Sequence, residues 1–132
     1  MKKIVNESLQ TTVDGTDYLV LAVKADLARG SSDVLPSDRL LHSETLNISR
    51  GISKSFPVLI DLSEVKKVDL YGLHAILSCR RILKGRTENV FLLPSKPLLC
   101  FLKLMFFDHD EVVRSRKRFE CLIQKKKTHE KS

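Results

Sequence analysis

The chain has 132 residues, 42% of them hydrophobic, which suits one domain with its own core and excludes a wholly disordered chain. The formal net charge is +7, yet residues 112–132 hold eight basic and two acidic side chains, so the preceding 111 residues are nearly neutral. We therefore expect a neutral globular body and a basic C-terminal region, which disfavours nucleic acid as the main partner.

The N-terminus and the cysteines indicate a cytoplasmic protein. Lys2 and Lys3 are not followed by the apolar run of a signal peptide, and no apolar stretch reaches the roughly 18 residues of a membrane-spanning helix. The cysteines form no C-x-x-C pair, and each lies among apolar residues: Cys79, Cys100 and Cys121. This pattern predicts free thiols that act as small core hydrophobes, in a protein of a reducing compartment.

The first part of the chain predicts two strands joined by a tight turn. Residues 1–8 are interpreted as a lead-in to a domain over residues 9–124. A strand at 9–13 and a buried apolar strand at 18–23 flank Asp14-Gly15, a typical hairpin turn sequence.

A loop, a helix and a second buried strand follow. Residues 28–36 predict a polar loop. Ser37 is placed to cap a helix over 38–51, whose apolar positions recur on one helical face. Residues 56–62 predict a strand that is apolar on both faces, as in the interior of a sheet covered by helices.

The second half alternates helices with one more strand. We expect a helix over 70–84, a strand over 90–93, a helix over 97–105 and a last helix capped by Asp110. Residues 125–132 lack apolar side chains and are predicted as a disordered basic tail. Strands that alternate with helices indicate the α/β class, with parallel strand pairs in the sheet.

The segment from Val58 to Leu77 is the most informative part of the sequence. A buried strand ends in Asp61-Leu62-Ser63, and a short excursion leads to Asp69, which is placed to cap the next helix. Such a helix N-terminus offers backbone N–H groups to an anion or to the polar groups of a partner. Gly72 removes a side chain where the backbone must be approached closely.

This pattern resembles the STAS domain, the family of anti-sigma factor antagonists and of sulfate-transporter C-terminal domains. Members have a strand ending in D-L-S, five or six residues, and then D-S-x-G-L at the start of a helix. The matching segments are Asp61-Leu62-Ser63 and Asp69-Leu70-Tyr71-Gly72-Leu73, and the resemblance covers about residues 9–123. It implies a single STAS-like domain with a mixed sheet of about four strands and helices mainly on one face.

Position 70 departs from the family pattern. Regulatory members carry there a serine or threonine that a partner kinase phosphorylates, whereas Leu70 has no hydroxyl and the phenol of Tyr71 projects too far for a Ser/Thr kinase site. Phosphorylation adds about −1.5 to −2 charges and can abolish a docked interface. We therefore expect no phosphorylation at the usual position, so that the protein either binds its partner without this off-switch or has lost the kinase.

A second departure is the length of the connection between the strands at 18–23 and 56–62. By the resemblance it is longer than usual, with the surplus in residues 29–36. This surplus either lengthens the partner-binding face or is a tolerated surface loop.

Other residue combinations do not indicate catalysis, a metal or a cofactor. The acidic residues fit strand ends and helix caps, and the five glycines are isolated, unlike those of a phosphate-binding loop. The histidines show no ligand spacing, and His74 lies five residues from Cys79, which is awkward for joint ligation. We expect a protein that is not an enzyme, with no metal and no cofactor.

Two segments leave alternatives open. The apolar stretch 101–107 is either core or a patch that faces a partner or lipid. Basic residues between Arg114 and Lys131 either form a solvated surface or bind anionic lipid or nucleic acid. The lack of interleaved aromatic side chains disfavours a single-strand nucleic-acid platform.

The sequence thus predicts a non-catalytic STAS-domain interaction module of bacterial signalling and transcription regulation. It would dock an anti-sigma factor or a serine kinase-like ATPase, and so release a sigma factor, through residues 69–73. Asp69 would cap the helix, Gly72 would allow close approach, Leu70 and Tyr71 would supply apolar contact, and Leu73 completes the motif. The alternative is an accessory STAS subunit of an ABC-type membrane transport complex, with a transporter subunit as partner. The oligomeric state is left open.

Overall fold

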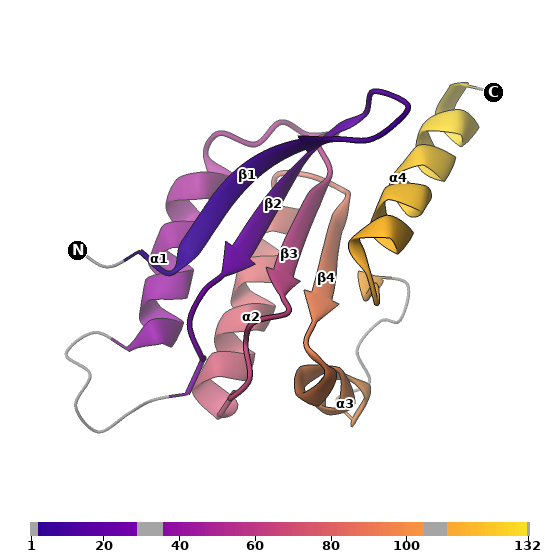
Figure 1. Ribbon diagram of the computed structural model, residues 1–132. Helices are drawn as coiled ribbons and strands as arrows, with labels where there is room; N and C mark the ends of the chain where they lie inside the picture. The colour runs from indigo at the N-terminus through magenta and orange to yellow at the C-terminus, as the bar shows by residue number, and fades with distance from the viewer. Residues whose placement is uncertain (1–2, 29–35, 105–110, 132) are drawn as a thin grey trace.

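Eight elements build the fold of the computed structural model, which describes residues 3–28, 36–104 and 111–131, with backbone only for Leu104 and residues 125–131. They are β1 (Val5–Thr11), β2 (Asp17–Val23), α1 (Ser37–Ser49), β3 (Val58–Leu62), α2 (Leu70–Lys84), β4 (Val90–Pro94), α3 (Lys96–Leu104) and α4 (Arg116–Lys131) (Figure 1). The predicted surplus loop falls on residues 29–35, which lie outside the described residues.

The four strands form one mixed sheet in the order β1-β2-β3-β4. β1 and β2 are antiparallel, whereas β2, β3 and β4 run parallel because helices cross over between them. The hairpin turn depends on Gly15, whose φ of 89° is readily adopted only by glycine. The predicted α/β class and four-stranded mixed sheet are confirmed.

The strand before the hairpin begins earlier than predicted. β1 starts at Val5, not at residue 9, so the expected lead-in of residues 1–8 is too long. Ile4 and Val5 are buried, and their N–H groups donate to the carboxylate of Glu44, each at 3.2 Å. The start of this strand was not predicted because Asn6, Glu7 and Ser8, which follow Val5, are polar and show no apolar alternation.

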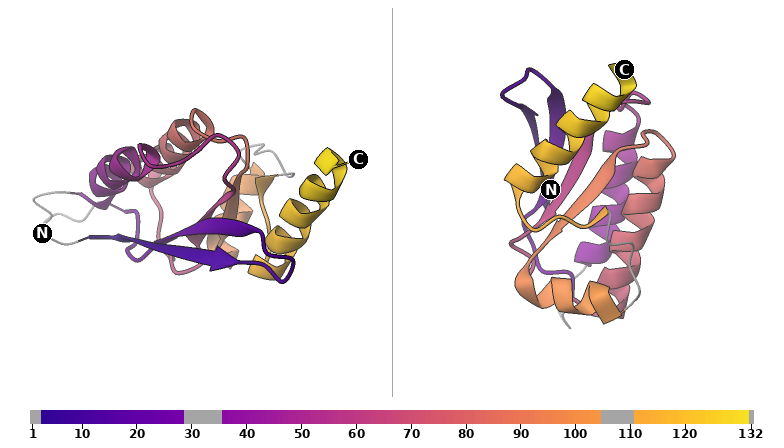
Figure 2. Two further views of the ribbon diagram at one scale, coloured as in Figure 1. Left: turned by 90° about the horizontal axis from the view of Figure 1, so that it is seen from above. Right: turned by 90° about the vertical axis from the view of Figure 1, so that its right-hand side faces the viewer.

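Helices cover the two faces of the sheet unequally (Figure 2). α1 and α2 lie on one face, where they and two α3 side chains, Leu98 and Leu102, pack in the larger core cluster. α4 lies on the opposite face and closes a smaller cluster around Phe119. The prediction of helices mainly on one face is therefore confirmed, with α4 as the cover of the second.

Aromatic contacts hold α4 on the second face. The ring of Phe119 packs edge-on against Tyr18 at 4.9 Å and Phe91 at 5.3 Å between centroids. The Tyr18 hydroxyl donates to Glu120 Oε2 at 2.5 Å. Burial, together with this bond to a carboxylate, raises the pKa of Tyr18 to about 12.

Several helix ends differ from the prediction. Ser37 is the first residue of α1 rather than its cap, because Pro36 occupies the N-cap and its ring fixes the φ that precedes the helix. Asp110, the predicted cap of the last helix, lies outside the described residues. α4 starts only at Arg116, after Val112 has paired beside Leu92 of β4. α4 continues to Lys131, so the expected disordered tail is largely helical. Four of its residues are lysine and one is glutamate, which are good helix formers even without apolar contacts.

Among the described residues, none of the helices has both the length and the apolar character needed to cross a membrane.

Candidate functional site

The loop between β3 and α2 is fixed by the segment that follows β2. The carboxylate of Asp26 accepts the N–H groups of Lys66 at 2.8 Å and Lys67 at 3.2 Å. These bonds to the ionised form hold the pKa of Asp26 below its usual value. Leu27 pairs with Val68 in a parallel bridge, so the approach to α2 is attached to the domain body.

Asp69 caps α2 as predicted. Its Oδ1 accepts the N–H of Gly72 at 2.8 Å, and its backbone is extended, as an N-cap residue requires. Its own N–H donates to Leu27 O at 3.2 Å. The first turn of α2 is thus held both from within the helix and from the neighbouring segment.

Gly72 is needed for a contact inside the protein. A Cβ at this position would lie 1.8 Å from Leu27 O and 2.6 Å from Leu27 Cβ, so only glycine lets the helix approach this backbone. Gly72 is buried, and the prediction that it makes room for a partner is corrected: the space is filled by Leu27.

Leu73 also belongs to the interior. Its side chain is only 4% exposed and packs in the larger core cluster, so it is corrected from a docking residue to a core residue. The D-x-x-G-L pattern places Leu73 one residue past Gly72, on the face of α2 that turns toward the sheet.

Leu70 and Tyr71 are the two residues of the motif whose side chains stand out from the surface. Leu70 is 77% exposed and Tyr71 is 54% exposed. Side chains of this size and exposure, adjacent in sequence and carried by a fixed helical turn, are available for contact with another molecule.

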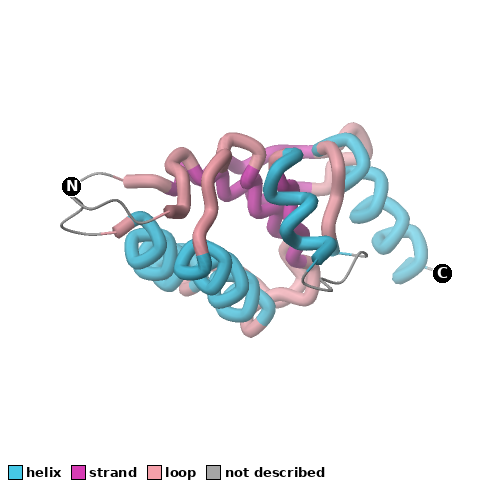
Figure 3. Tube along the Cα trace, turned by 90° about the horizontal axis from the view of Figure 1, so that it is seen from below, coloured by secondary structure: helices cyan, strands magenta, loops and turns pink. Residues whose placement is uncertain are grey.

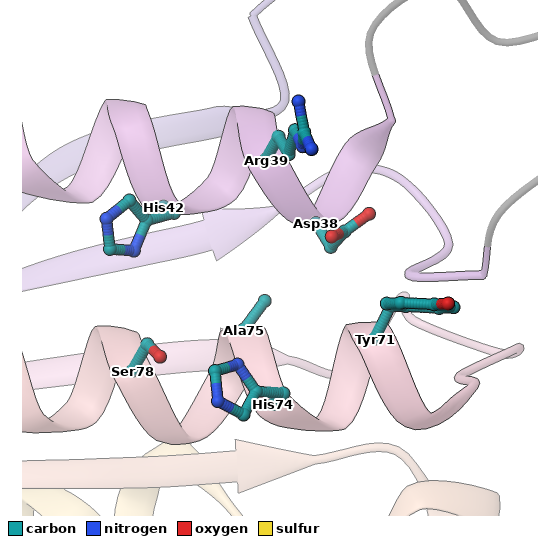
Figure 4. Close-up of a pocket in the computed structure, with 7 residues that line it drawn as sticks. All are labelled: Asp38, Arg39, His42, Tyr71, His74, Ala75 and Ser78. Carbon is teal, nitrogen blue, oxygen red and sulfur yellow. The ribbon is translucent and has the colours of Figure 1, made fainter.

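Tyr71 also borders a shallow groove between α1 and α2 (Figure 4). The groove encloses about 410 Å³, and its walls combine charged, imidazole and hydroxyl groups: Asp38, Arg39, His42, Tyr71, His74, Ala75 and Ser78. Sequence reasoning missed this groove. The sequence does place Asp38 and His42 on one face of a helix, and Tyr71, His74 and Ser78 on one face of another. That these two faces line one groove follows only once α1 and α2 are known to be neighbours.

α3 lies at the same end of the molecule as the start of α2 (Figure 3). Within the predicted apolar stretch 101–107, Leu102 is buried, whereas Phe101 is 47% exposed. Residues 105–107 lie outside the described residues. The described part of this stretch therefore contributes both to the core and to the surface at the carboxyl end of the parallel strands.

Of the three cysteines predicted as core residues, only Cys79 is buried; the prediction is wrong for Cys100 and Cys121, which are exposed. Cys79 is buried beside Thr45, with 3.1 Å between Sγ and Oγ1, and burial raises its pKa to about 11, so it stays a thiol near neutral pH. Within residues 3–28, 36–103 and 111–124, no three His, Cys, Asp or Glu side chains gather as metal ligands would.

Compared with models of known protein families, the chain matches none, and none of the curated proteins matches it.

Proposed function

We propose that the protein is a non-catalytic, cytoplasmic interaction module of the STAS type in bacterial signalling. Leu70 and Tyr71 would dock an anti-sigma factor or a serine kinase-like ATPase. The observation that carries the proposal is the exposure of these two adjacent side chains, 77% and 54%, at the start of α2. Tyrosine and large apolar side chains are typical of the central, desolvated part of protein interfaces.

The backbone that carries Leu70 and Tyr71 is suited to docking because it is fixed before a partner arrives. The Asp69 cap and the contact of Gly72 with Leu27 hold the first turn of α2. A surface that is ordered in the free protein loses less conformational entropy on binding. Asp69 and Gly72 thus act in the proposal as positioning residues.

The surroundings of Leu70 support a partner with an apolar contact surface next to polar groups. The Leu70 side chain is aliphatic and has no hydroxyl. The groove beside Tyr71 is lined by Asp38, Arg39 and two histidines, which can form hydrogen bonds with polar groups of a partner. A partner would bury Leu70 and Tyr71 and place polar side chains over the groove. Because position 70 cannot accept a phosphate, the association would not be switched off there.

A comparison of three proteins tests this proposal: wild type, Leu70→Asp, and the control Leu46→Asp. Leu46 is 41% exposed on α1 and receives the same chemical change away from the start of α2. Each protein is immobilised, and partners from a bacterial host lysate are quantified by mass spectrometry. We expect Leu70→Asp to lose an ATPase-like or anti-sigma partner that wild type and Leu46→Asp retain. Equal recovery by all three proteins would contradict docking through Leu70.

A second candidate is an accessory subunit of an ABC-type transport complex. Phe101 favours it, because its exposed aromatic side chain belongs to α3, and α3 lies at the same end of the molecule as the start of α2 (Figures 1 and 3). Contact with Phe101 would widen the apolar contact area. Phe101→Asp is added to the same experiment as a fourth protein. Transporter subunits that wild type recovers and that both Leu70→Asp and Phe101→Asp lose would support this candidate over the sigma-regulatory one.

A further inference from the structure

The two edges of the sheet are treated differently. At the β4 edge, Val112 pairs with Leu92 and the Val113 N–H donates to Leu92 O at 2.8 Å, while Pro94 ends the strand. β1 at the other edge is seven residues long and contains neither proline nor lysine. Proteins usually protect such an edge with these residues or cover it, because it is a template for pairing with another strand.

The hydrogen bonds of the hairpin define which groups of β1 face outward. The N–H of Lys24 donates to Ile4 O at 2.7 Å, and the N–H of Thr12 donates to Thr16 O at 2.9 Å. In an antiparallel ladder, residues bonded to the neighbour alternate with residues whose N–H and C=O point away. Even-numbered positions bond to β2, so the outward backbone groups of the central and final part of β1 belong to Glu7, Leu9 and Thr11. Within the described part of the chain, these three backbones bond to no other element.

We propose that two copies of this chain pair through β1, antiparallel about a two-fold axis at Leu9, and join their sheets into one of eight strands. Leu9 of each copy would lie opposite Leu9 of the other, and Glu7 opposite the second copy's Thr11. The occupant of the edge is thus a second copy, since the strand is complementary to itself in this register.

Burial and charge favour this register over its neighbours. Leu9 is 65% exposed in the single chain, and the two-fold axis covers it with an identical apolar side chain. A shift of the axis to Glu7 would place two carboxylates opposite each other. A shift to Ser8 would place each Leu9 opposite a Glu7. Of these three registers, only the one centred on Leu9 places Leu9 opposite an apolar side chain and Glu7 opposite a neutral one.

The proposed pairing is independent of the docking function. Leu9 lies opposite Leu19 near the beginning of β2, whereas α2 starts beyond the carboxyl end of β3, at the other end of the sheet (Figure 1). Both docking surfaces would remain accessible in the dimer. The pairing can therefore be tested without any partner protein.

Sedimentation equilibrium tests the proposal by measuring the mass of the protein in solution at micromolar concentrations. A reductant keeps Cys100 and Cys121 from forming disulfides. We expect wild type to have twice the mass of the chain. Leu9→Lys and Leu9→Glu each place like charges on the axis and should weaken association at least about tenfold. An equimolar mixture of the two variants should recover the doubled mass, because Lys now faces Glu; this recovery also shows that both variants fold.

Each other result overturns the proposal. Wild type at the mass of one chain excludes self-pairing. A doubled mass for both single variants places the interface elsewhere. If Leu9→Lys associates more strongly than wild type and Leu9→Glu does not, residue 9 faces Glu7 of the second copy, and the axis lies at Ser8 rather than at Leu9. Folded single variants whose mixture stays at the mass of one chain exclude an axis at Leu9.

Discussion

Replacing Gly72 by alanine provides a direct test of how the start of α2 is held. The new Cβ would lie 1.8 Å from Leu27 O, and no side-chain rotation relieves a contact with a backbone atom. Either α2 or the segment at Leu27 must move. That movement would weaken the bond from Asp69 N–H to Leu27 O, 3.2 Å, and the Asp69 cap.

The expected cost follows from these contacts. Overpacking costs roughly 1–3 kcal/mol, and loss of the cap costs about 1 kcal/mol. Alanine's better helix propensity offsets about 0.5–1 kcal/mol. Together these effects should make Gly72→Ala lower the free energy of unfolding by about 1–3.5 kcal/mol, a large share of the stability of a small domain.

Urea unfolding monitored by circular dichroism measures this change, with Gly51→Ala as the matched control. A Cβ at Gly51 has no neighbour closer than Ile48 O at 3.8 Å, so that variant should be neutral or slightly stabilised. If Gly72→Ala unfolds within about 0.5 kcal/mol of wild type, the tight contact with Leu27 is not what holds the first turn of α2.

Three further predictions concern the cap, a tyrosine and the thiols. Asp69→Ala should lower the free energy of unfolding by about 1 kcal/mol in urea, whereas Asp69→Asn should restore most of it; equal stability of all three proteins would argue against the cap. Because the pKa of Tyr18 rises from 10.0 to about 12, its stabilising contribution is complete below pH 10 and is lost as the pH rises through 12. Unfolding measured across this window should show a decline that Tyr18→Phe reduces, and an identical decline in that variant would contradict the assignment. A thiol reagent at neutral pH should leave Cys79 unlabelled until the protein unfolds while it labels the two exposed thiols, Cys100 and Cys121; rapid labelling of all three would contradict the burial of Cys79.

Local patterns were sufficient to predict most of the sheet and the cap. The short apolar run at 18–23, bounded by a turn sequence and polar residues, favoured a buried strand over a helix, and Asp69 preceded a helix at the spacing that capping requires. These features depend on residues close together in sequence. The same holds for the interior position of β3, where consecutive apolar residues face both core clusters.

The roles of Gly72 and Leu73 could not be read in the same way. Gly72 is glycine because Leu27, 45 positions earlier, passes against it, and no local pattern reports that approach. The groove beside Tyr71 likewise needs α1 and α2 as neighbours. Residues 125–131 were misjudged because the absence of apolar side chains excludes a packed helix but does not exclude a helix.

The unequal covering of the sheet has a consequence for biosynthesis. α4 follows all four strands in the chain, so the ribosome completes the sheet before the helix that covers its second face. Until α4 is synthesised and Phe119 packs on the sheet, the side chains of Tyr18, Leu59 and Phe91 are exposed to solvent. In that interval the nascent chain presents an aromatic surface of the kind that promotes aggregation between incompletely folded chains. The yield of folded protein should therefore depend on how quickly α4 docks, even though α4 contributes no strand to the sheet.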